Sequence, residues 1–226
     1  MCALPISEML PAEQKQHPHY HGTLGRNVGT IATRLQDVGY HTCIAGKWHL
    51  GMTPDLLPIN RGFERTVILA DSGADKWEQK PFLPIYDKAN WFADGMETEL
   101  PEDFYSSRFL IDKTIEFIDS NAADDHPFFA YVPFQAVHLP VQAPQEFIDR
   151  YMGVYDKGWD RLRYERRRKA AELRIIPAEA DQVAMRTTDD RPMLPPDEKR
   201  YQAKRMAVKA GMVEPMDFHI SRSIEH

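Results

Sequence analysis

Apolar and polar positions follow two different periods along this chain. Residues 101–121 place Ile111, Ile115 and Ile118 at helical spacing, which predicts an amphipathic helix. After a turn signal, an unbroken apolar run extends from Phe128 to Phe134. Such a run is typical of a strand that is buried on both faces of a parallel sheet. This part of the chain therefore predicts a helix that leads into an interior strand.

The same order of helix and strand occurs earlier in the chain. Thr30 to Val38 has a helical pattern with Gly39 as its stop, and Thr42 to Ala45 predicts a short strand. Gly62 to Leu69 predicts another strand. Helices that alternate with strands are typical of βαβ units. We therefore expect an α/β fold with a mostly parallel sheet.

The remaining segments have weaker patterns. Residues 1–22 predict an irregular lead-in, and residues 23–226 one domain. The alternation of His17, His19 and His21 could suggest a metal, but it is more typical of an unstructured tract. A long surface loop is expected over residues 71–95, and helices over 145–152, 159–173 and from 198 onward, where Pro215 should kink or end the helix.

The candidate chemistry begins in the stretch Gly39 to Gly51, which reads GYHTCIAGKWHLG. In an extended segment Lys47 and His49 would point the same way, roughly 7 Å apart. A cation beside an imidazole suits a doubly charged oxyanion such as sulfate or phosphate. Gly46 and Gly51 would allow the backbone to approach a ligand. The alternative is a strand with a surface lysine and a structural histidine.

His138 is the third candidate, because it follows the predicted strand over Phe128 to Phe134. Ligands of open α/β sheets bind outside the carboxyl ends of the strands. Lys47 and His49 follow the earlier strand, so we expect all three side chains to converge on one crevice. The alternative is that His138 is a turn residue.

Composition limits the function classes. The net charge of −6 gives no general basic field for nucleic acid or an anionic membrane, and the Arg-rich run over residues 161–169 predicts a solvated helix face. No stretch approaches the roughly 20 apolar residues of a membrane span. Residues 1–11 lack the features of a signal peptide, so the compartment stays open. The two cysteines form no disulfide framework, and no zinc-binding motif occurs.

Two blocks carry a family resemblance. GYHTCIAGKWHLG resembles the second signature of the sulfatases, and residues 127–144 resemble the sulfatase segment that bears another active-site histidine. Residues 155–177 are similar to bacterial arylsulfatases in particular. The resemblance extends from about Thr23 onward. It implies an internal fragment of the alkaline-phosphatase-like superfamily, with a partial three-layer α/β/α fold that is incomplete at both ends.

The resemblance also implies a function, the hydrolysis of sulfate esters of the arylsulfatase type. Lys47 would bind the sulfate and the nucleophile, a formylglycine hydrate. His49 would assist the breakdown of that hydrate, and His138 would protonate the leaving group or bind sulfate. A Ca²⁺ ion is expected for the full family domain. The partner would be a small sulfate ester or a sulfated sugar, whose organic part the sequence leaves open.

Other parts of the family pattern do not occur in this chain. Formylglycine arises from the Cys or Ser of a C/S-x-P/A-x-R motif, which the contexts of Cys2, Cys43 and Ser72 do not match. The pairs Asp124-Asp125 and Asp189-Asp190 lie in polar stretches and predict solvated turns rather than metal ligands. The isolated chain is therefore expected to be marginally stable and inactive. A truncated or degenerate non-catalytic sulfatase, and a phosphonate or phosphate ester hydrolase of the same superfamily, remain alternatives.

Overall fold

A computed structural model describes residues 23–182 and 193–226 of the chain. These residues fall into two compact units. The first comprises residues 23–140 with Pro215–His226, and the second comprises residues 141–182 and 193–214. The sequence did not predict this subdivision of residues 23–226. The expected lead-in over residues 1–22 and the pair Asp189-Asp190 lie outside the described residues.

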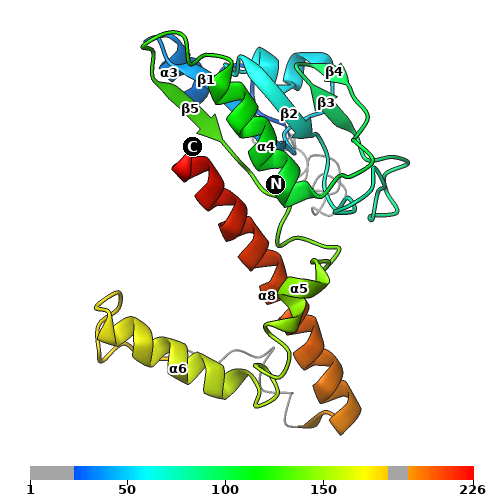
Figure 1. Ribbon diagram of the computed structural model, residues 1–226, viewed down its shortest axis with the longest axis vertical. Helices are drawn as coiled ribbons and strands as arrows, with labels where there is room; N and C mark the ends of the chain where they lie inside the picture. Colours follow the sequence, from blue (N-terminus) through cyan, green and yellow to red (C-terminus); the bar gives the residue numbers. More distant parts are fainter. Residues whose placement is uncertain (1–22, 183–192) are drawn as a thin grey trace, which may run out of the picture. The chain divides into compact units, whose positions relative to one another are not determined.

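The first unit is built on a five-stranded sheet (Figure 1). The central strand β1 pairs in parallel with β2 on one side and β5 on the other. The strands β3 and β4 extend the sheet beyond β2 in antiparallel pairing. The mostly parallel α/β sheet that the sequence predicts is confirmed. The strands, in spatial order from β4 to β5, are Met96–Glu97, Trp91–Ala93, Arg65–Leu69, His41–Lys47 and Phe128–Tyr131.

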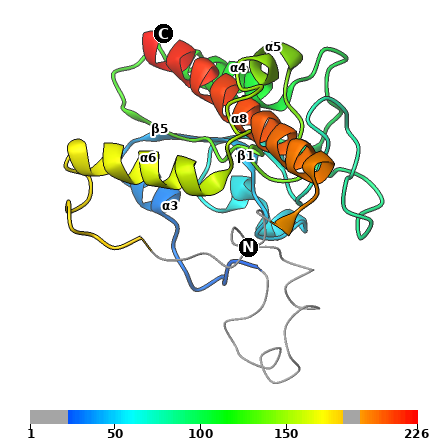
Figure 2. The ribbon, with the colours of Figure 1, turned by 90° about the horizontal axis from the view of Figure 1, so that it is seen from below.

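Two helices cover opposite faces of this sheet (Figure 2). On one face Leu110 and Phe117 of α4 (Ser106–Asp119) pack in a cluster with Cys43 of β1. On the other face Ala32 of α3 (Ile31–Gln36) packs in a cluster with Ile44 of the same strand. Because both faces are covered, β1 is buried along its interior, as parallel strands generally are. The layers of this unit are therefore helix, sheet and helix.

Strand β5 differs from its prediction. The apolar run favoured a strand buried on both faces, but β5 is the last strand of the described sheet and covers only Phe128–Tyr131. Phe128 is 53% exposed and Tyr131 is 48% exposed. An apolar run reports that a segment is hydrophobic, but not how many strands lie beside it. The prediction of an interior strand was therefore wrong, although the strand itself exists.

The segment after β2 is also more buried than predicted. Residues 71–95 were expected to form a surface loop, but Asp71, Ser72 and Lys76 are each 2% exposed or less. The backbone carbonyl of Lys76 accepts a 2.9 Å hydrogen bond from the amide of Ser106, the first residue of α4. This bond ties the segment to the start of the helix. Polar character alone did not reveal that the first residues of this segment are buried.

The second unit is helical. It contains α5 (Gln145–Asp149), α6 (Trp159–Glu172) and the part of α8 (Pro196–Glu225) that precedes Pro215. Its core includes Tyr155, Ala203 and Ala207. No residue of α6 is buried, so the Arg-rich run is a solvated helix face as expected. Helix α8 continues through Pro215 rather than ending there. Among the residues that the structure describes, none of the helices combines the length and apolar character that crossing a membrane requires.

Candidate anion site at the carboxyl ends of the strands

The candidate site lies where β1, β2 and β5 end. The amide of Lys47, the last residue of β1, donates a 2.7 Å hydrogen bond to the carbonyl of Pro133 in the segment after β5. The amide of His49 donates to the carbonyl of Ala70, just after β2, at 3.2 Å. The chain segments that follow all three strands are thus held side by side. This is the end of a parallel sheet at which ligands generally bind.

Gly46 makes this close approach possible. A Cβ atom at Gly46 would lie 2.2 Å from the carbonyl oxygen of Pro133, and the residue has φ +149°. The sequence predicted that Gly46 and Gly51 allow the backbone to approach a ligand. In the structure each glycine instead accommodates a neighbouring segment of the chain, since a Cβ at Gly51 would meet Leu56 at 2.6 Å. Gly46 therefore shapes the site through chain packing.

His49 lies inside the protein. It is 5% exposed and has φ +59°, so the regular alternation that would place it on the same side as Lys47 ends before it. Burial, and then the positive charge of Lys47 and that of His138, lower the pKa of His49 to about 3. The ring is therefore neutral at pH 7. Both of its nitrogens are buried without a hydrogen-bond partner, which makes His49 available to a ligand.

His138 lies after β5 and is exposed. Its Nδ1 lies 3.0 Å from the carbonyl oxygen of Leu139, so Nδ1 carries the hydrogen and donates it. In the neutral ring Nε2 is then the acceptor. The amide of His138 donates to the carbonyl of Gln135 at 2.9 Å, in the same segment whose Pro133 carbonyl accepts from the amide of Lys47, so the segments that bear Lys47 and His138 meet at this end of the sheet.

Lys76 is a further side chain of the candidate site, which sequence reasoning missed. It is 2% exposed, and its Nζ donates to the side-chain oxygen of Gln135 at 3.5 Å and to the carbonyl of Ala74 at 3.4 Å. Burial lowers the pKa of Lys76 to about 8, Asp75 opposes this, and the charge of Lys47 lowers it further. Its position in a polar loop carried no periodic signal. Only the fold shows that the side chain of Lys76 reaches Gln135, in the segment that follows β5.

Other buried polar atoms lie in the segments that follow β2 and β5. Asp71 accepts hydrogen bonds from the amide and the side chain of Asn90 at its Oδ2, whereas its Oδ1 has no partner. Burial raises the pKa of Asp71 despite these bonds and the charge of Lys47. The hydroxyl of Ser72 and the amide nitrogen of Gln135 are likewise buried and unpaired. Buried polar groups are normally hydrogen-bonded, so this concentration of unpaired ones indicates a ligand-binding site.

The residues that the structure describes at this end of the sheet do not fit a calcium ion. Calcium takes six to eight oxygen ligands, mostly carboxylates and carbonyls. Asp71 offers one oxygen that is not already bound by Asn90, and it stands among lysines and histidines. Cys43 does not fit the role of a formylglycine precursor either. It is 7% exposed in the core beneath α4, where burial raises its pKa to about 11.

Comparisons with a family model and with individual proteins point to the same family. The family model described as Sulfatase matches residues 2–226. An uncharacterized sulfatase of Schizosaccharomyces pombe is 35% identical over 223 residues, which cover 92% of this chain and 39% of that protein. The arylsulfatase of Klebsiella aerogenes is 32% identical over 208 residues, which cover 91% of this chain and 45% of the relative. The chain thus spans less than half the length of these relatives.

A solved structure supports the fold. The crystal structure of Ps i-CgsB in complex with k-i-k-neocarrahexaose superimposes with a TM-score of 0.54 at 22% identity. The match covers 90% of this chain and 38% of that one. At this sequence identity the structural similarity is evidence for the fold alone.

Proposed function

This chain belongs to the sulfatase family, and we propose that it supplies the anion-binding side chains of a site that hydrolyses sulfate esters. One observation carries the proposal: His49, with two buried and unpaired nitrogens, and the buried Lys76 lie where three strands end, together with further buried, unpaired polar atoms. Such groups are costly to bury in the absence of a ligand, because charged and polar groups lose their hydration. An anion would compensate for that loss.

The proposed roles follow from the state of each side chain. Lys47 and Lys76 supply positive charge to the sulfate oxygens. Lys76 has a pKa of about 8, so it is mostly protonated at pH 7, and a bound dianion would raise its pKa further. The neutral His49 can donate one hydrogen bond and accept another, which suits contact with both an oxyanion and a hydroxyl group.

His138 is proposed to act on the leaving group. Its Nε2 is the acceptor in the neutral ring, and the residue is exposed, so Nε2 can take a proton from solvent and pass it to a departing oxygen. A substitution to Gln would keep a hydrogen-bonding side chain but remove this proton transfer. The family implies calcium and formylglycine, but none of the described residues at this end of the sheet fits a ligand of the one or a precursor of the other. The chemistry assigned to the chain therefore rests on its own lysines and histidines.

The test is the binding of inorganic sulfate to the full chain, measured by titration calorimetry. Lys47→Met and Lys76→Met should each weaken binding about 10-fold or more, since a hydrogen bond to a charged group contributes about 1.5–3 kcal/mol. Lys113→Met is the matched control. Lys113 lies on α4 and pairs with Glu116 at 2.6 Å, so its loss should leave the affinity unchanged.

Equal losses of sulfate affinity in all three variants would mean that binding depends only on the net charge of the chain, and would refute the site. Sulfate also stabilises proteins generally by being excluded from their surface. The difference in sulfate affinity between Lys47→Met or Lys76→Met and the control Lys113→Met, rather than a melting temperature alone, is therefore the informative comparison.

A phosphate ester hydrolase is the second candidate, because phosphate has a similar shape and charge. The name of the Klebsiella aerogenes relative, an arylsulfatase, favours sulfate. Titration with inorganic phosphate under the same conditions separates the two. Tighter binding of phosphate than of sulfate would favour the alternative. Whether the organic part of the substrate is an aryl group or a sugar is a separate question that aryl sulfates and sulfated sugars can test side by side.

A further inference from the structure

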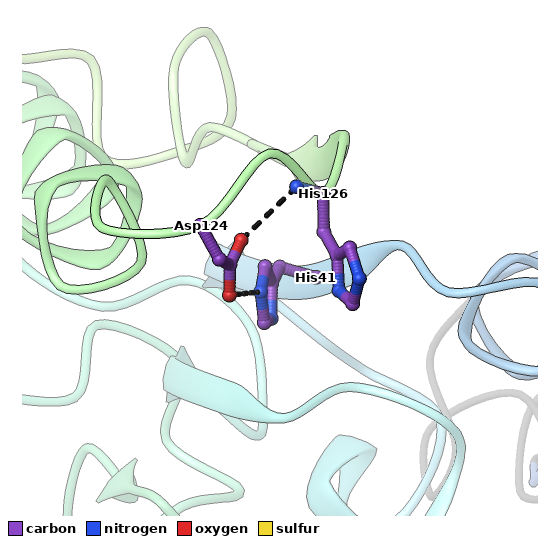
Figure 3. A group of neighbouring side chains, drawn as sticks. All are labelled: His41, Asp124 and His126. Carbon is purple, nitrogen blue, oxygen red and sulfur yellow. Dashed lines mark hydrogen bonds and ion pairs between the residues drawn. The ribbon is translucent and has the colours of Figure 1, made fainter.

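A second cluster of chemically active side chains lies at the opposite, amino ends of β1 and β5. Figure 3 shows His41 on β1, with Asp124 and His126 on the segment that leads from α4 into β5. One nitrogen of each histidine and one oxygen of Asp124 all lie within 4.8 Å of one another. None of these residues takes part in the anion site.

Backbone pairing fixes this arrangement. His41 and Phe128 are partners in the parallel register of β1 and β5, and the amide of His41 donates to the carbonyl of Pro127 at 2.9 Å. Residues just before Phe128 must therefore lie beside His41. The amide of His126 in turn donates to Asp124 Oδ1 at 3.1 Å, which leaves Oδ2 directed at His41.

The hydrogen bonds of His41 have the pattern found in metal centres. Its Nε2 lies 2.9 Å from Asp124 Oδ2, and its Nδ1 lies 3.1 Å from Glu64 Oε2. In proteins a histidine that binds a metal through one nitrogen usually donates the other to a carboxylate, which fixes the ring. Glu64 occupies that supporting position. The ring centroids of His41 and His126 lie 5.7 Å apart, so a second imidazole is close enough to serve as a metal ligand.

We propose that His41, Asp124 and His126 bind a Zn²⁺ ion, with Glu64 orienting His41. Two imidazoles and a carboxylate are a known ligand set for zinc, with bonds of about 2.0–2.2 Å and the fourth position open to water. Ligand atoms of one tetrahedral ion lie about 3.4 Å apart, by the same bond lengths. Asp124 and His126 are exposed and can rotate to close the distance from 4.8 Å. The ion would replace the proton between His41 Nε2 and Asp124.

The expected consequence is structural. The ion would join the first residue of β1 to the segment before β5, across a pair of strands whose partner residues are far apart in the sequence. An ion that binds only the folded chain stabilises it in proportion to the logarithm of its concentration. Zn²⁺ should therefore raise the melting temperature of the chain, whereas Ca²⁺, which prefers oxygen ligands, should not.

The test is calorimetric titration of the full chain with Zn²⁺. All variants carry alanine at His17, His19 and His21, because that alternation could itself bind the ion. In this background Zn²⁺ should bind with a stoichiometry of one. His126→Ala and Asp124→Asn should each weaken binding at least about 10-fold, and Glu64→Gln should weaken it by about 10-fold as an outer-shell change. His126 is exposed, so its removal leaves the fold intact.

His226→Ala is the matched control, because His226 is an exposed histidine that follows α8 and pairs with Asp119 rather than with this cluster. The affinity of this variant for Zn²⁺ should equal that of the background chain. The proposal is overturned if millimolar Zn²⁺ does not bind the background chain, if His126→Ala binds it unchanged, or if His126→Ala and His226→Ala lower the affinity equally.

Discussion

Lys76 is the residue expected to make the stability of the chain depend on pH above neutrality. The unfolded chain holds the proton of a lysine up to a pH near 10.5, whereas the folded chain releases it near 8. Between these values the unfolded state binds more protons, so stability rises with pH across this window. Below pH 8 the buried charge lowers the stability by about 3 kcal/mol, from the size of the shift.

Lys76→Met should therefore stabilise the chain at pH 7 and flatten the rise in stability between pH 8 and 10. Urea unfolding at several pH values measures both effects. Lys80→Met, which removes a lysine that is exposed in the same loop, serves as the control and should keep the rise. A wild-type chain whose stability falls across this window would contradict the burial of Lys76 as a charge.

At His49 we expect stability and binding to move in opposite directions. His49→Leu nearly keeps the volume and removes two buried, unpaired nitrogens. Unpaired buried polar groups cost about 1–3 kcal/mol each, so the substitution should leave the free energy of unfolding unchanged or raise it by about 1 kcal/mol. Sulfate binding should weaken in the same variant. Chemical denaturation and calorimetry measure the two quantities.

His41→Leu provides the contrast for that experiment. His41 is bonded to two carboxylates, so its loss should lower stability by about 1 kcal/mol rather than raise it. If His49→Leu were the more destabilising of the two, His49 would be a packing residue and not a ligand.

Sequence reasoning identified some of these residues and missed others for a physical reason. Lys47, His49 and His138 were predicted from their position after strands and from motif resemblance. Lys76 could not be predicted in this way. Its burial depends on a backbone bond to Ser106, 30 positions away, which no local pattern records.

At the scale of elements, the closeness of β1 to the segment after β5 depends on Gly46. Gly46→Ala would place a methyl group 2.2 Å from a carbonyl oxygen, at a positive φ that other residues rarely adopt. Because the backbone must move to relieve this clash, we expect the free energy of unfolding to fall by about 3 kcal/mol or more. Thermal or urea unfolding gives the value.

Gly39→Ala is a close control for this prediction. Gly39 also has a positive φ of +89°, but a Cβ there would meet nothing within 4 Å. Its substitution should cost only the conformational strain, about 1–2 kcal/mol. Equal losses at the two positions would show that strain, not the contact with Pro133, explains the effect at Gly46.

The elements were predicted well where local patterns decide them. Helix α3 begins after Thr30, whose side chain accepts a 3.0 Å bond from the amide of Thr33, and the sequence placed the helix there. Helix α4 was predicted too, but of the predicted isoleucine stripe only Ile111 is buried, whereas Ile115 and Ile118 are half-buried. The other buried residues of the helix are Ser106, Ser107, Leu110, Thr114 and Phe117. The exposure of β5 depends on its position in the sheet, which a one-dimensional pattern does not contain.

At the scale of the whole molecule, binding and catalysis should separate. The printed sequence has no C/S-x-P/A-x-R motif, and holding a substrate in its ground state does not accelerate its reaction. The purified chain should therefore bind sulfate but not hydrolyse an aryl sulfate, even with calcium and a formylglycine-generating enzyme. A chromogenic assay measures this. Turnover above background that disappears in Lys47→Ala would contradict the prediction.

The sheet order also determines when the anion site is completed during synthesis. The central strand β1 receives its second neighbour, β5, about 80 residues after β1 itself has been made. At about 5–20 residues per second, a ribosome needs several seconds to supply that neighbour. Until then β1 presents an open edge to the surroundings of the nascent chain, although β2 is available to pair with its other side. Anion binding can begin only after this interval, because the site is incomplete until β5 and the segment that follows it have been synthesised.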